Sequence, residues 1–292
     1  MIIVRIQGGL GNQLFQYAIG RRLAADQHTE LVIDISLLNC VDELTTPREY
    51  KLDCFNIVGR ISQEGDLDNV LGCKWLRPLK RRLYKMGLDV FHWNYFREVV
   101  FGFHPDVVKC RKSAALEGYW QSEYYFLSIR DILLAELTLK DEYTTESFSA
   151  IQHEMQTVNS VALHVRRGDY VNHQKINQQF GTCTLEYYAQ AIKLMRHKLD
   201  EPVFYLFSDD LEWCRENLSD SASFKIVEGF EDYQDLALIS SCAHQIIANS
   251  SFSWWGAWLN SNPGKIVIAP KVWFANPQID TRHVVPNDWI RL

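Results

Sequence analysis

Histidine, arginine and aspartate gather in one short segment, residues 164–170, directly after an apolar stretch. The segment contains His164, Arg166, Arg167 and Asp169. A guanidinium group binds phosphate through two parallel hydrogen bonds, which is a common reason to place arginine at the end of a buried strand. The adjacent arginines therefore favour an anion-binding site. The alternative is a structural pair between one arginine and an aspartate, with the other arginine solvated.

A second polar pair, Asp209 and Asp210, follows the apolar run 203–207. Carboxylates suit hydrogen bonds to a hydroxyl-rich ligand. Asp210 is equally suited to cap a helix that begins there, because its side-chain oxygen can accept a hydrogen bond from the backbone of the first turn. The sequence leaves both interpretations open.

Ser250, Ser251 and Phe252 precede a tryptophan-rich helical segment at 253–259. Hydroxyl groups at a helix N-terminus form an anion site, since the backbone N–H groups and the helix dipole both favour negative charge. At least two of the three tryptophans are expected in the core, because such large rings contribute most when buried. The start of this helix is therefore a candidate phosphate site.

A glycine-rich turn with Gly8, Gly9 and Gly11 follows the first apolar run. It lets the backbone approach a bound group, and the next helix offers its positive end. Asp34 closes the following apolar run, where a dinucleotide-binding fold places its ribose acid. The third glycine of that motif is missing. A nucleotide-dependent oxidoreductase built on this unit is one alternative hypothesis, and a plain tight turn is the simplest.

The elements that carry these segments alternate between strand and helix. Apolar runs predict strands at 2–6, 31–35, 158–165, 203–207, 224–227, 245–248 and 265–269. Apolar residues at helical spacing predict helices at 12–25, 185–199, 210–218, 233–242 and 253–259. Such alternation is typical of parallel sheets, which bind ligands at the carboxyl ends of their strands.

Two alternating halves predict an α/β protein with two Rossmann-like domains that face each other across a cleft. We expect an N-terminal domain at 1–150 and a C-terminal domain at 151–292, hinged near 140–155. The stretch 40–110 is expected to form insertions on the first sheet, because basic helical patterns and aromatic clusters interrupt the alternation.

The composition excludes several classes of protein. The chain has 292 residues, a formal net charge of −6 and 47% hydrophobic residues, so it is neither disordered nor generally attracted to nucleic acid. Its seven cysteines are irregularly spaced, which favours a reducing cytoplasm over a disulfide framework. No apolar run has the length of a signal peptide or a membrane span.

One basic segment and one acidic pair need separate interpretation. Residues 74–86 combine basic and apolar side chains at helical spacing, which suits an anionic membrane surface; a solvated basic face is the alternative. Asp66 and Asp68 have the spacing of the metal-binding pair of some sugar transferases. They lie away from any predicted strand end, so we expect an acidic loop and no bound metal.

Five segments, taken in order, resemble the α-1,2-fucosyltransferases of glycosyltransferase family 11, in particular the soluble bacterial type. They are residues 8–17, 116–123, 164–170, 207–210 and 247–256. The resemblance implies the GT-B fold, which agrees with the two alternating halves. It also implies inverting transfer of L-fucose from GDP-β-L-fucose to O2 of a galactosyl residue, without a metal or other cofactor.

The resemblance further implies the partners and the location. GDP-fucose would bind the C-terminal domain, and a galactose-terminated oligosaccharide or lipopolysaccharide acceptor, free or lipid-linked, would bind the N-terminal one, as in O-antigen biosynthesis. Nucleic acid is not an expected partner. The expected location is the cytoplasm, with peripheral contact to the inner membrane through residues 74–86 as an open alternative.

By the same resemblance, Arg166, Asn12 and Asp169 would be the catalytic residues. Arg166 would stabilise the β-phosphate as GDP departs, because a metal-free site must meet that charge with fixed donors. Asp169 would orient the arginines, and Asn12 would reach the fucosyl–phosphate linkage. The other candidates would bind the donor: Gly9, Gly11, His164, Arg167, Asp209, Asp210, Asp235, Ser250, Ser251 and Phe252.

The resemblance also implies more specific roles for some of these residues. Asp235 would accept hydrogen bonds from guanine, whose N1–H and exocyclic amine are both donors. His164 would contact the nucleotide or its phosphate, while the serines and Phe252 would line the phosphate and nucleoside pocket.

The group that takes the proton from the acceptor hydroxyl stays open. A carboxylate or histidine is suited to that role, although a loose, dissociative transition state needs a strong base less. The candidates are Asp34, Glu117, Glu123 and His173. A non-catalytic sugar-binding module is a further alternative, weakened by the paired arginines, which neutral sugars do not require.

Overall fold

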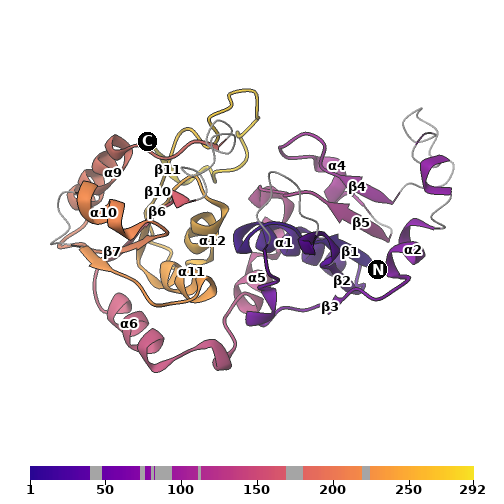
Figure 1. The fold of residues 1–292 in the computed structure, drawn as a ribbon, viewed down its shortest axis with the longest axis horizontal. Coiled ribbons are helices and arrows are strands. Elements are labelled where there is room, and N and C mark those ends of the chain that lie inside the picture. Colours follow the sequence, from indigo (N-terminus) through magenta and orange to yellow (C-terminus); the bar gives the residue numbers. More distant parts are fainter. Residues whose placement is uncertain are drawn as a thin grey trace. The chain divides into compact units, whose positions relative to one another are not determined.

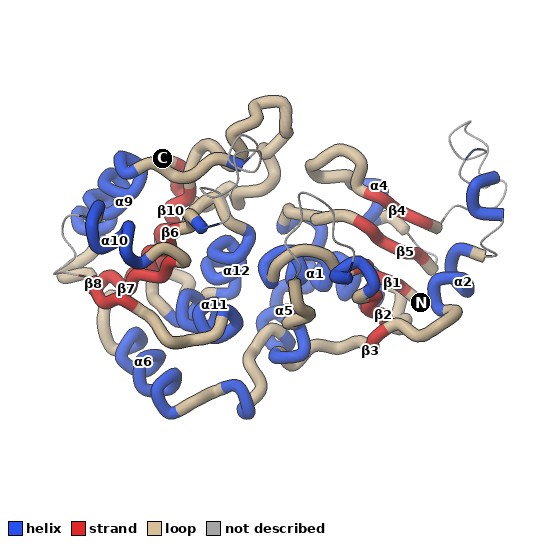
Figure 2. Tube along the Cα trace, in the orientation of Figure 1, coloured by secondary structure: helices blue, strands red, loops and turns tan. Residues whose placement is uncertain are grey.

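The computed structural model describes residues 1–39, 48–72, 76–79, 82, 94–110, 113–168, 180–218 and 224–292. The chain forms two compact units, each built around its own parallel sheet (Figure 1 and Figure 2). The first unit holds Met1–Leu52 and Ile57–Leu133, and the second holds Asp53–Asn56 and Leu134–Leu292. Residues 134–150, which the sequence assigned to the N-terminal domain, therefore pack within the second unit.

The first unit has a five-stranded parallel sheet in the order β3-β2-β1-β5-β4. The strands are β1 Ile2–Arg5, β2 Leu31–Asp34, β3 Arg60–Ile61, β4 Tyr95–Arg97 and β5 Ala114–Glu117. Its helices include α1 Leu10–Asp26, α2 Asp66–Leu71, α4 Pro105–Val108 and α5 Arg130–Glu136. The apolar runs of β1 and β2 are buried throughout, as expected of parallel strands covered on both faces.

Helices cover both faces of this first sheet. On one face, Gly20 of α1 lies so close to Val4 and Leu31 that a methyl group at this position would collide with them. On the other face, Leu71 of α2 packs in a cluster with Ile3 and its neighbours on the sheet. Side chains alternate between the two faces along a strand. The strand residues two positions after those that pack on α2 therefore also point to the α2 side, and they lie at the carboxyl edge of the sheet.

The second unit has a six-stranded parallel sheet in the order β11-β10-β9-β6-β7-β8. The strands are β6 Ser160–Val165, β7 Val203–Ser208, β8 Phe224–Ile226, β9 His244–Ile246, β10 Val267–Ala269 and β11 Ile290–Arg291. Its helices include α6 Glu146–Gln156, α9 Leu185–Lys198, α10 Leu211–Asn217, α11 Asp232–Ser241 and α12 Ser251–Leu259.

The two faces of this second sheet have separate apolar cores. Leu163 and Leu206 point to the face covered by α9 and α10, where they pack with Met195 and Cys214. Ala162 and Tyr205, one position earlier, point to the opposite face, which α6 and α11 cover. Phe252, at the start of α12, packs on this second core as well.

The predicted alternation of strands and helices is confirmed in both units, with element ends within a few residues of those expected. Helix α6 occupies most of 140–155, where the sequence suggested a hinge. The stretch 40–110 contributes β3, α2, β4 and α4, all short elements without a clear periodic pattern. Strand β5 was not predicted, because two of its four residues are alanines, which are uncommon in strands and give only a weak apolar signal.

No helix in the described ranges is both long and apolar enough to cross a membrane. Most of the basic segment 74–86, which was considered for membrane contact, lies outside the described residues.

Helices α11 and α12 approach each other closely at Gly256. A methyl group there would collide with Ile239 of α11 and would meet the backbone carbonyl of Leu236 at 3.7 Å. Glycine normally weakens a helix by about 1 kcal/mol relative to alanine. Its presence inside α12 is explained by this close packing, which fixes the two helices side by side.

Gly256→Ala is therefore expected to destabilise the protein by about 1–3 kcal/mol, the usual cost of overpacking, in spite of the higher helix propensity of alanine. Denaturant unfolding measures the change. The control is Gly264→Ala, because Gly264 lies in a turn where an added methyl group would meet its nearest neighbouring atom, Asn262 Oδ1, at 3.5 Å. A Gly256→Ala protein as stable as the wild type would show that α11 and α12 are not tightly packed here.

Candidate functional site

The carboxyl ends of β6 and β7 bring two of the polar segments together in the second unit. The strands pair in parallel along their whole length, with His164 opposite Phe207 and Val165 opposite Ser208. The residues that follow therefore leave the sheet side by side. This register is the reason that the arginines after β6 meet the aspartates after β7.

Arg166 and His164 lie on the α12 side of this edge. The Arg166 Nη1 atom forms an ion pair with Asp209 Oδ2 at 2.8 Å, and both side chains are about three-quarters buried. The imidazole ring of His164 lies 5.5 Å from the ring of Phe252, centroid to centroid. The structure thus brings the predicted catalytic Arg166 and three predicted donor-binding residues, from three segments of the sequence, to one place.

His164 is uncharged at neutral pH. Its pKa is lowered to about 4, mainly by burial; Asp209 acts in the opposite direction, and the positive charge of Arg166 adds to the lowering. Its Nδ1 atom is buried and has no hydrogen-bond partner among the described residues. A buried polar atom without a partner is uncommon in native proteins, and here it leaves one ring nitrogen for a bound group.

Arg167 points to the opposite side of the same edge. Its guanidinium lies 3.9 Å from the ring centroid of Trp213, and its Nε atom pairs with Asp210 at 3.1 Å. Its backbone N–H donates to Asp209 at 2.9 Å. Asp210 also caps α10 by accepting from the Trp213 N–H at 3.1 Å. Arg167 and Asp210 therefore have structural roles on the α10 side, whatever else they bind.

The arginine pair does not require an outside anion to be neutralised. The sequence favoured an anion-binding site at the adjacent arginines, with a structural pair to an aspartate as the alternative. The structure shows two such pairs, one for each arginine, with Asp209 and Asp210. Asp169, the other predicted partner, lies outside the described residues, as does His173.

The N-terminus of α12 lies at the same edge of the second sheet. Ser250 is the N-cap residue, and its hydroxyl accepts from the Phe252 N–H at 3.3 Å. Ser251 is the first helical residue. The tryptophans behind them, at 254, 255 and 258, are buried, so all three belong to the core. An N-cap role explains Ser250 without a ligand, while the helix end itself still favours negative charge.

Asp235 is a partly buried residue near the start of α11. Desolvation, together with the nearby negative charges of Asp232 and Glu231, raises its pKa to about 7. Its Oδ1 atom is buried without a hydrogen-bond partner among the described residues. Asp235 lies in the first turn of α11, which packs beside α12, so it belongs to the same edge as Ser250.

The glycine-rich turn belongs to the first unit. Gly8 has φ +77°, and a methyl group on it would lie 2.7 Å from Asn12 Nδ2, so both the conformation and the space require glycine. The Asn12 Oδ1 atom accepts from Gln121 Nε2 at 2.8 Å. Helix α1 begins at Leu10, so Gly11 lies in its first turn and Gly9 is the N-cap.

Asp34 is bound within the protein rather than open to a ribose. Its two oxygens accept from Arg5 Nε and from the Ser36 N–H, each at 3.0 Å. Burial alone would raise the pKa of Asp34, but the hydrogen bonds from Ser36 and Arg5 outweigh it and hold the pKa below its ordinary value. Asp34 is therefore a weak base, and the dinucleotide-binding alternative loses its ribose acid.

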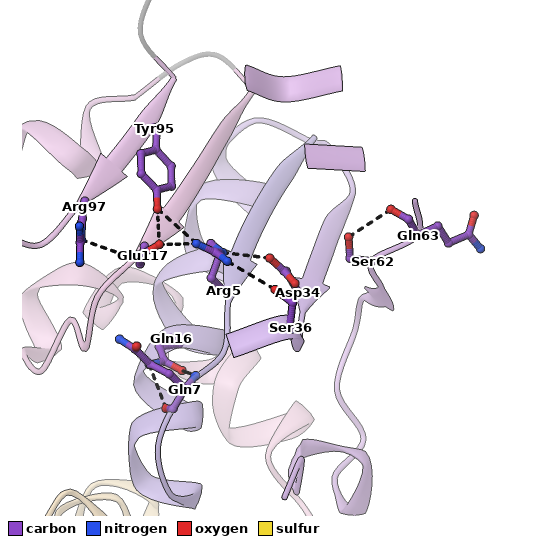
Figure 3. Close-up of polar contacts among 10 residues, drawn as sticks. All are labelled: Arg5, Gln7, Gln16, Asp34, Ser36, Ser62, Gln63, Tyr95, Arg97 and Glu117. Atoms are coloured by element: carbon purple, nitrogen blue, oxygen red, sulfur yellow. Dashed lines mark hydrogen bonds and ion pairs between the residues drawn. The ribbon is translucent and has the colours of Figure 1, made fainter. Parts of the chain in front are cut away.

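The other base candidates differ in their surroundings. Glu117 accepts hydrogen bonds from Arg5 and Tyr95 and pairs with Arg97, so its carboxylate is already fully engaged (Figure 3). Glu123 begins a short 3₁₀ turn at the surface of the first unit. Neither geometry assigns a base.

Asp66 and Asp68 lie in helix α2, not in a loop as expected. Asp66 is paired with Arg60 at 2.6 Å, and Asp68 is paired with Arg77. Among the described residues no group of three or more histidine, cysteine, aspartate or glutamate side chains is arranged to hold a metal ion.

Arg5, Tyr95 and Arg97 were not among the predicted site residues. They meet Asp34 and Glu117 at the carboxyl edge of the first sheet (Figure 3). The available signal was a charged residue directly after an apolar run, as in Val4-Arg5. Strand β4 has no such run, so Arg97 could not be recognised in the same way.

Comparison with known proteins identifies relatives along the whole chain. The sequence model described as Glycosyl transferase family 11 matches residues 92–292. The Alpha-1,2-colitosyltransferase of Escherichia coli is 31% identical over 302 residues, which cover 100% of this chain and 99% of that protein. The O-antigen biosynthesis glycosyltransferase WbnK of Escherichia coli is 29% identical and covers 98% of this chain and 99% of its own.

Animal and structural relatives are more distant. Galactoside alpha-(1,2)-fucosyltransferase 1 of Saimiri boliviensis boliviensis is 29% identical over 154 residues, 49% of this chain and 42% of that protein. The crystal structure of NodZ alpha-1,6-fucosyltransferase soaked with GDP-fucose superposes with a TM-score of 0.53 at 17% identity, covering 90% of this chain and 96% of that chain. At this identity the likeness shows the fold, and the predicted α/β GT-B fold is confirmed.

The raised pKa of the partly buried Asp235 makes stability depend on pH. In the unfolded chain an aspartate ionises near pH 4, whereas in the folded protein Asp235 holds its proton up to a pKa of about 7. The folded state therefore binds more protons between these values, and stability falls as pH rises through that window. Asp235→Asn removes this effect and should stabilise the protein progressively from about pH 4 to pH 7.

Denaturant unfolding of wild type and Asp235→Asn at pH 5 and pH 8 measures the difference. The exposed Asp288→Asn serves as the control and should shift stability equally at both pH values. A difference between Asp235→Asn and wild type that stays constant with pH would exclude the shifted ionisation.

Proposed function

Because the chain belongs to glycosyltransferase family 11, we propose that it transfers L-fucose from GDP-β-L-fucose to O2 of a galactosyl residue, with inversion at the fucose carbon. The proposal that the second unit binds GDP-fucose is supported by the residues at the carboxyl edge of the second sheet. There a paired arginine, a neutral histidine and a helix N-terminus lie together with a carboxylate on the adjacent helix that has one buried oxygen atom without a hydrogen-bond partner among the described residues.

Asp235 is the group that we assign to guanine. A carboxylate with two oxygen atoms, one of them without a partner among the described residues, can accept both guanine donors, and these hydrogen bonds favour its ionised form. Adenine offers no such pair of donors on its corresponding edge. The cost of keeping this carboxylate buried in the free protein is therefore offset when the nucleotide binds.

Arg166 is the group that we assign to the β-phosphate. As the fucosyl–oxygen bond breaks, negative charge grows on the departing GDP while the sugar ring takes on oxocarbenium character. Asp209 holds the guanidinium in place, so little reorganisation is needed to stabilise that charge. The neutral His164 and the first N–H groups of α12 would supply further donors to the diphosphate. We propose that this set works without a metal ion.

The acceptor side of the proposal rests on the relatives. The colitosyltransferase forms an α-1,2 linkage by its name, and WbnK is named for O-antigen biosynthesis. We propose a galactose-terminated glycan as the acceptor, bound by the first unit and free or lipid-linked. Action in the cytoplasm, with contact to the inner membrane through residues 74–86, is part of the same proposal.

The colitosyltransferase suggests a second donor. Colitose is L-fucose without its 3-hydroxyl group, so the two donors share the nucleotide, the diphosphate and most of the sugar. Comparing GDP-fucose with GDP-colitose at equal concentration decides between them. A site with a hydrogen bond to the 3-hydroxyl discriminates strongly against the deoxy sugar, while a site without one accepts both.

Arg166→Ala is expected to lower the turnover of GDP-fucose with lactose by about 100-fold or more, as loss of a charge-stabilising donor does. The assay contains EDTA, and Arg215→Ala is the matched control, because Arg215 is an exposed arginine of the same unit paired with Glu228. Full turnover by Arg166→Ala, or activity of the wild type only with added manganese, contradicts the role of arginine in place of a metal.

Asp235→Ala should raise the donor KM and reduce the preference for GDP over ADP as a product inhibitor, because the carboxylate that accepts from guanine is gone. Inhibition constants for both nucleotides measure this preference. Asp288→Ala should leave it unchanged. An unaltered preference for GDP in Asp235→Ala would place guanine elsewhere.

A further inference from the structure

A row of four side chains with alternating charge lies at the carboxyl edge of the first sheet. Asp34, Arg5, Glu117 and Arg97 are the last residues of the neighbouring strands β2, β1, β5 and β4. The parallel register sets Arg5 opposite Asp34 and Arg97 opposite Glu117. All four therefore project on the same face of the sheet (Figure 3).

This row replaces an apolar layer at the point where the strands end. One pleat earlier, Ile3, Val32 and Ala115 on the same face pack against α2 in the apolar cluster. The change from apolar to charged side chains within two residues on all these strands occurs at the edge where parallel sheets bind their ligands.

In the inner part of the row, Asp34 and Glu117 are both hydrogen-bonded to Arg5. Arg5 donates to Asp34 at 3.0 Å and also to Glu117 and Tyr95. Burial raises the pKa of Tyr95, and the adjacent Glu117 raises it further, so Tyr95 donates its proton to this network rather than losing it. Asp34, Arg5 and Glu117 thus form a rigid support, in which each side chain is more than four-fifths buried.

Arg97 is the outer end of the row. Its Nε atom pairs with Glu117 Oε1 at 2.9 Å, while its side chain is 59% exposed and Glu117 is 13% exposed. Its two terminal nitrogens have no ion-pair partner in the described part of the chain. A guanidinium anchored through Nε presents these two nitrogens together, in a geometry that suits two adjacent oxygen atoms.

The turn after β5 is tied through its backbone to Glu98, the residue that follows Arg97. The Glu98 carboxylate, next to Arg97, accepts from the backbone N–H groups of Tyr119 and Trp120, at 2.7 and 3.2 Å. Trp120 has φ +56° and is buried, so the turn is held in one conformation. Tyr119, two residues after Glu117, remains 37% exposed.

The chemistry of this surface favours a neutral polyhydroxyl ligand over an anion. The two carboxylates and two guanidinium groups of the row cancel in charge, so the row offers no net attraction to phosphate. Paired nitrogen donors suit neighbouring sugar hydroxyls, and an exposed tyrosine ring suits the apolar face of a sugar.

We propose that Arg97 and Tyr119 bind the terminal galactoside of the acceptor and set acceptor specificity. In this proposal the ion-paired side chains of Asp34, Arg5 and Glu117 support Arg97 and hold it in position. This inference rests on the proposed function for the identity of the sugar. It adds the residues that recognise the acceptor, all within the first unit, and it leaves the donor residues of the second unit unaffected.

The test compares Arg97→Ala with wild type in three measurements. Arg97→Ala should raise the KM for lactose by about tenfold to a hundredfold, the range for losing hydrogen bonds from a charged group. The KM for GDP-fucose and the rate of GDP-fucose hydrolysis without acceptor should stay within about twofold. Arg97→Lys should recover only part of the affinity, because an ammonium group lacks the paired donor geometry.

Lys109→Ala is the matched control, since Lys109 is an exposed cation of the same unit, 71% exposed and paired with Asp106. It should leave all three measurements unchanged. An unchanged lactose KM in Arg97→Ala overturns the inference, and so does an equal loss of hydrolysis and transfer.

Direct binding separates this inference from the proposed function. Saturation-transfer NMR with lactose alone, without any nucleotide, should show contact in the wild type and its loss in Arg97→Ala. If the wild type binds lactose in this way yet does not turn over GDP-fucose, the proposed donor is wrong while the acceptor site stands. Equal lactose signals from wild type and Arg97→Ala overturn the acceptor site.

Discussion

Both sheets end in partly buried arginine side chains held by a carboxylate from the neighbouring strand. Arg5 at the end of β1 pairs with Asp34, and Arg166 just beyond β6 pairs with Asp209. A charge removed from water is costly unless it is paired and hydrogen-bonded, so the parallel register that places these partners side by side is what allows arginine at these positions. The binding groups around each edge depend on that pairing, because it fixes where the guanidinium points.

Much of the fold followed from the sequence, because its main signals are local. Continuous apolar runs such as residues 203–207 mark strands buried on both faces, and alternation with helical segments marks parallel sheets. The meeting of Arg166 with Asp209 could also be expected, since both follow central strands and such strand ends share one edge. The burial of the three tryptophans of α12 follows from their size and apolar character.

Other features depend on contacts between distant residues and could not be predicted in this way. The roles of Asp34 and Arg97 depend on the register of β1, β2, β4 and β5, and β4 is only three residues long. The different roles of Arg166 and Arg167 follow from the side-chain alternation of a strand, but only the structure shows Trp213 beneath the second arginine. Gly256 is explained by Ile239, from a separate helix.

The most direct measurement is a crystal structure of the protein with GDP bound. We expect the β-phosphate within about 3 Å of the Arg166 guanidinium, the usual length of a charge-assisted hydrogen bond, and guanine N1–H and its amine on the Asp235 carboxylate. GDP bound instead at the glycine-rich turn of the first unit, with Arg166 still paired only with Asp209, would contradict the assignment of the donor site.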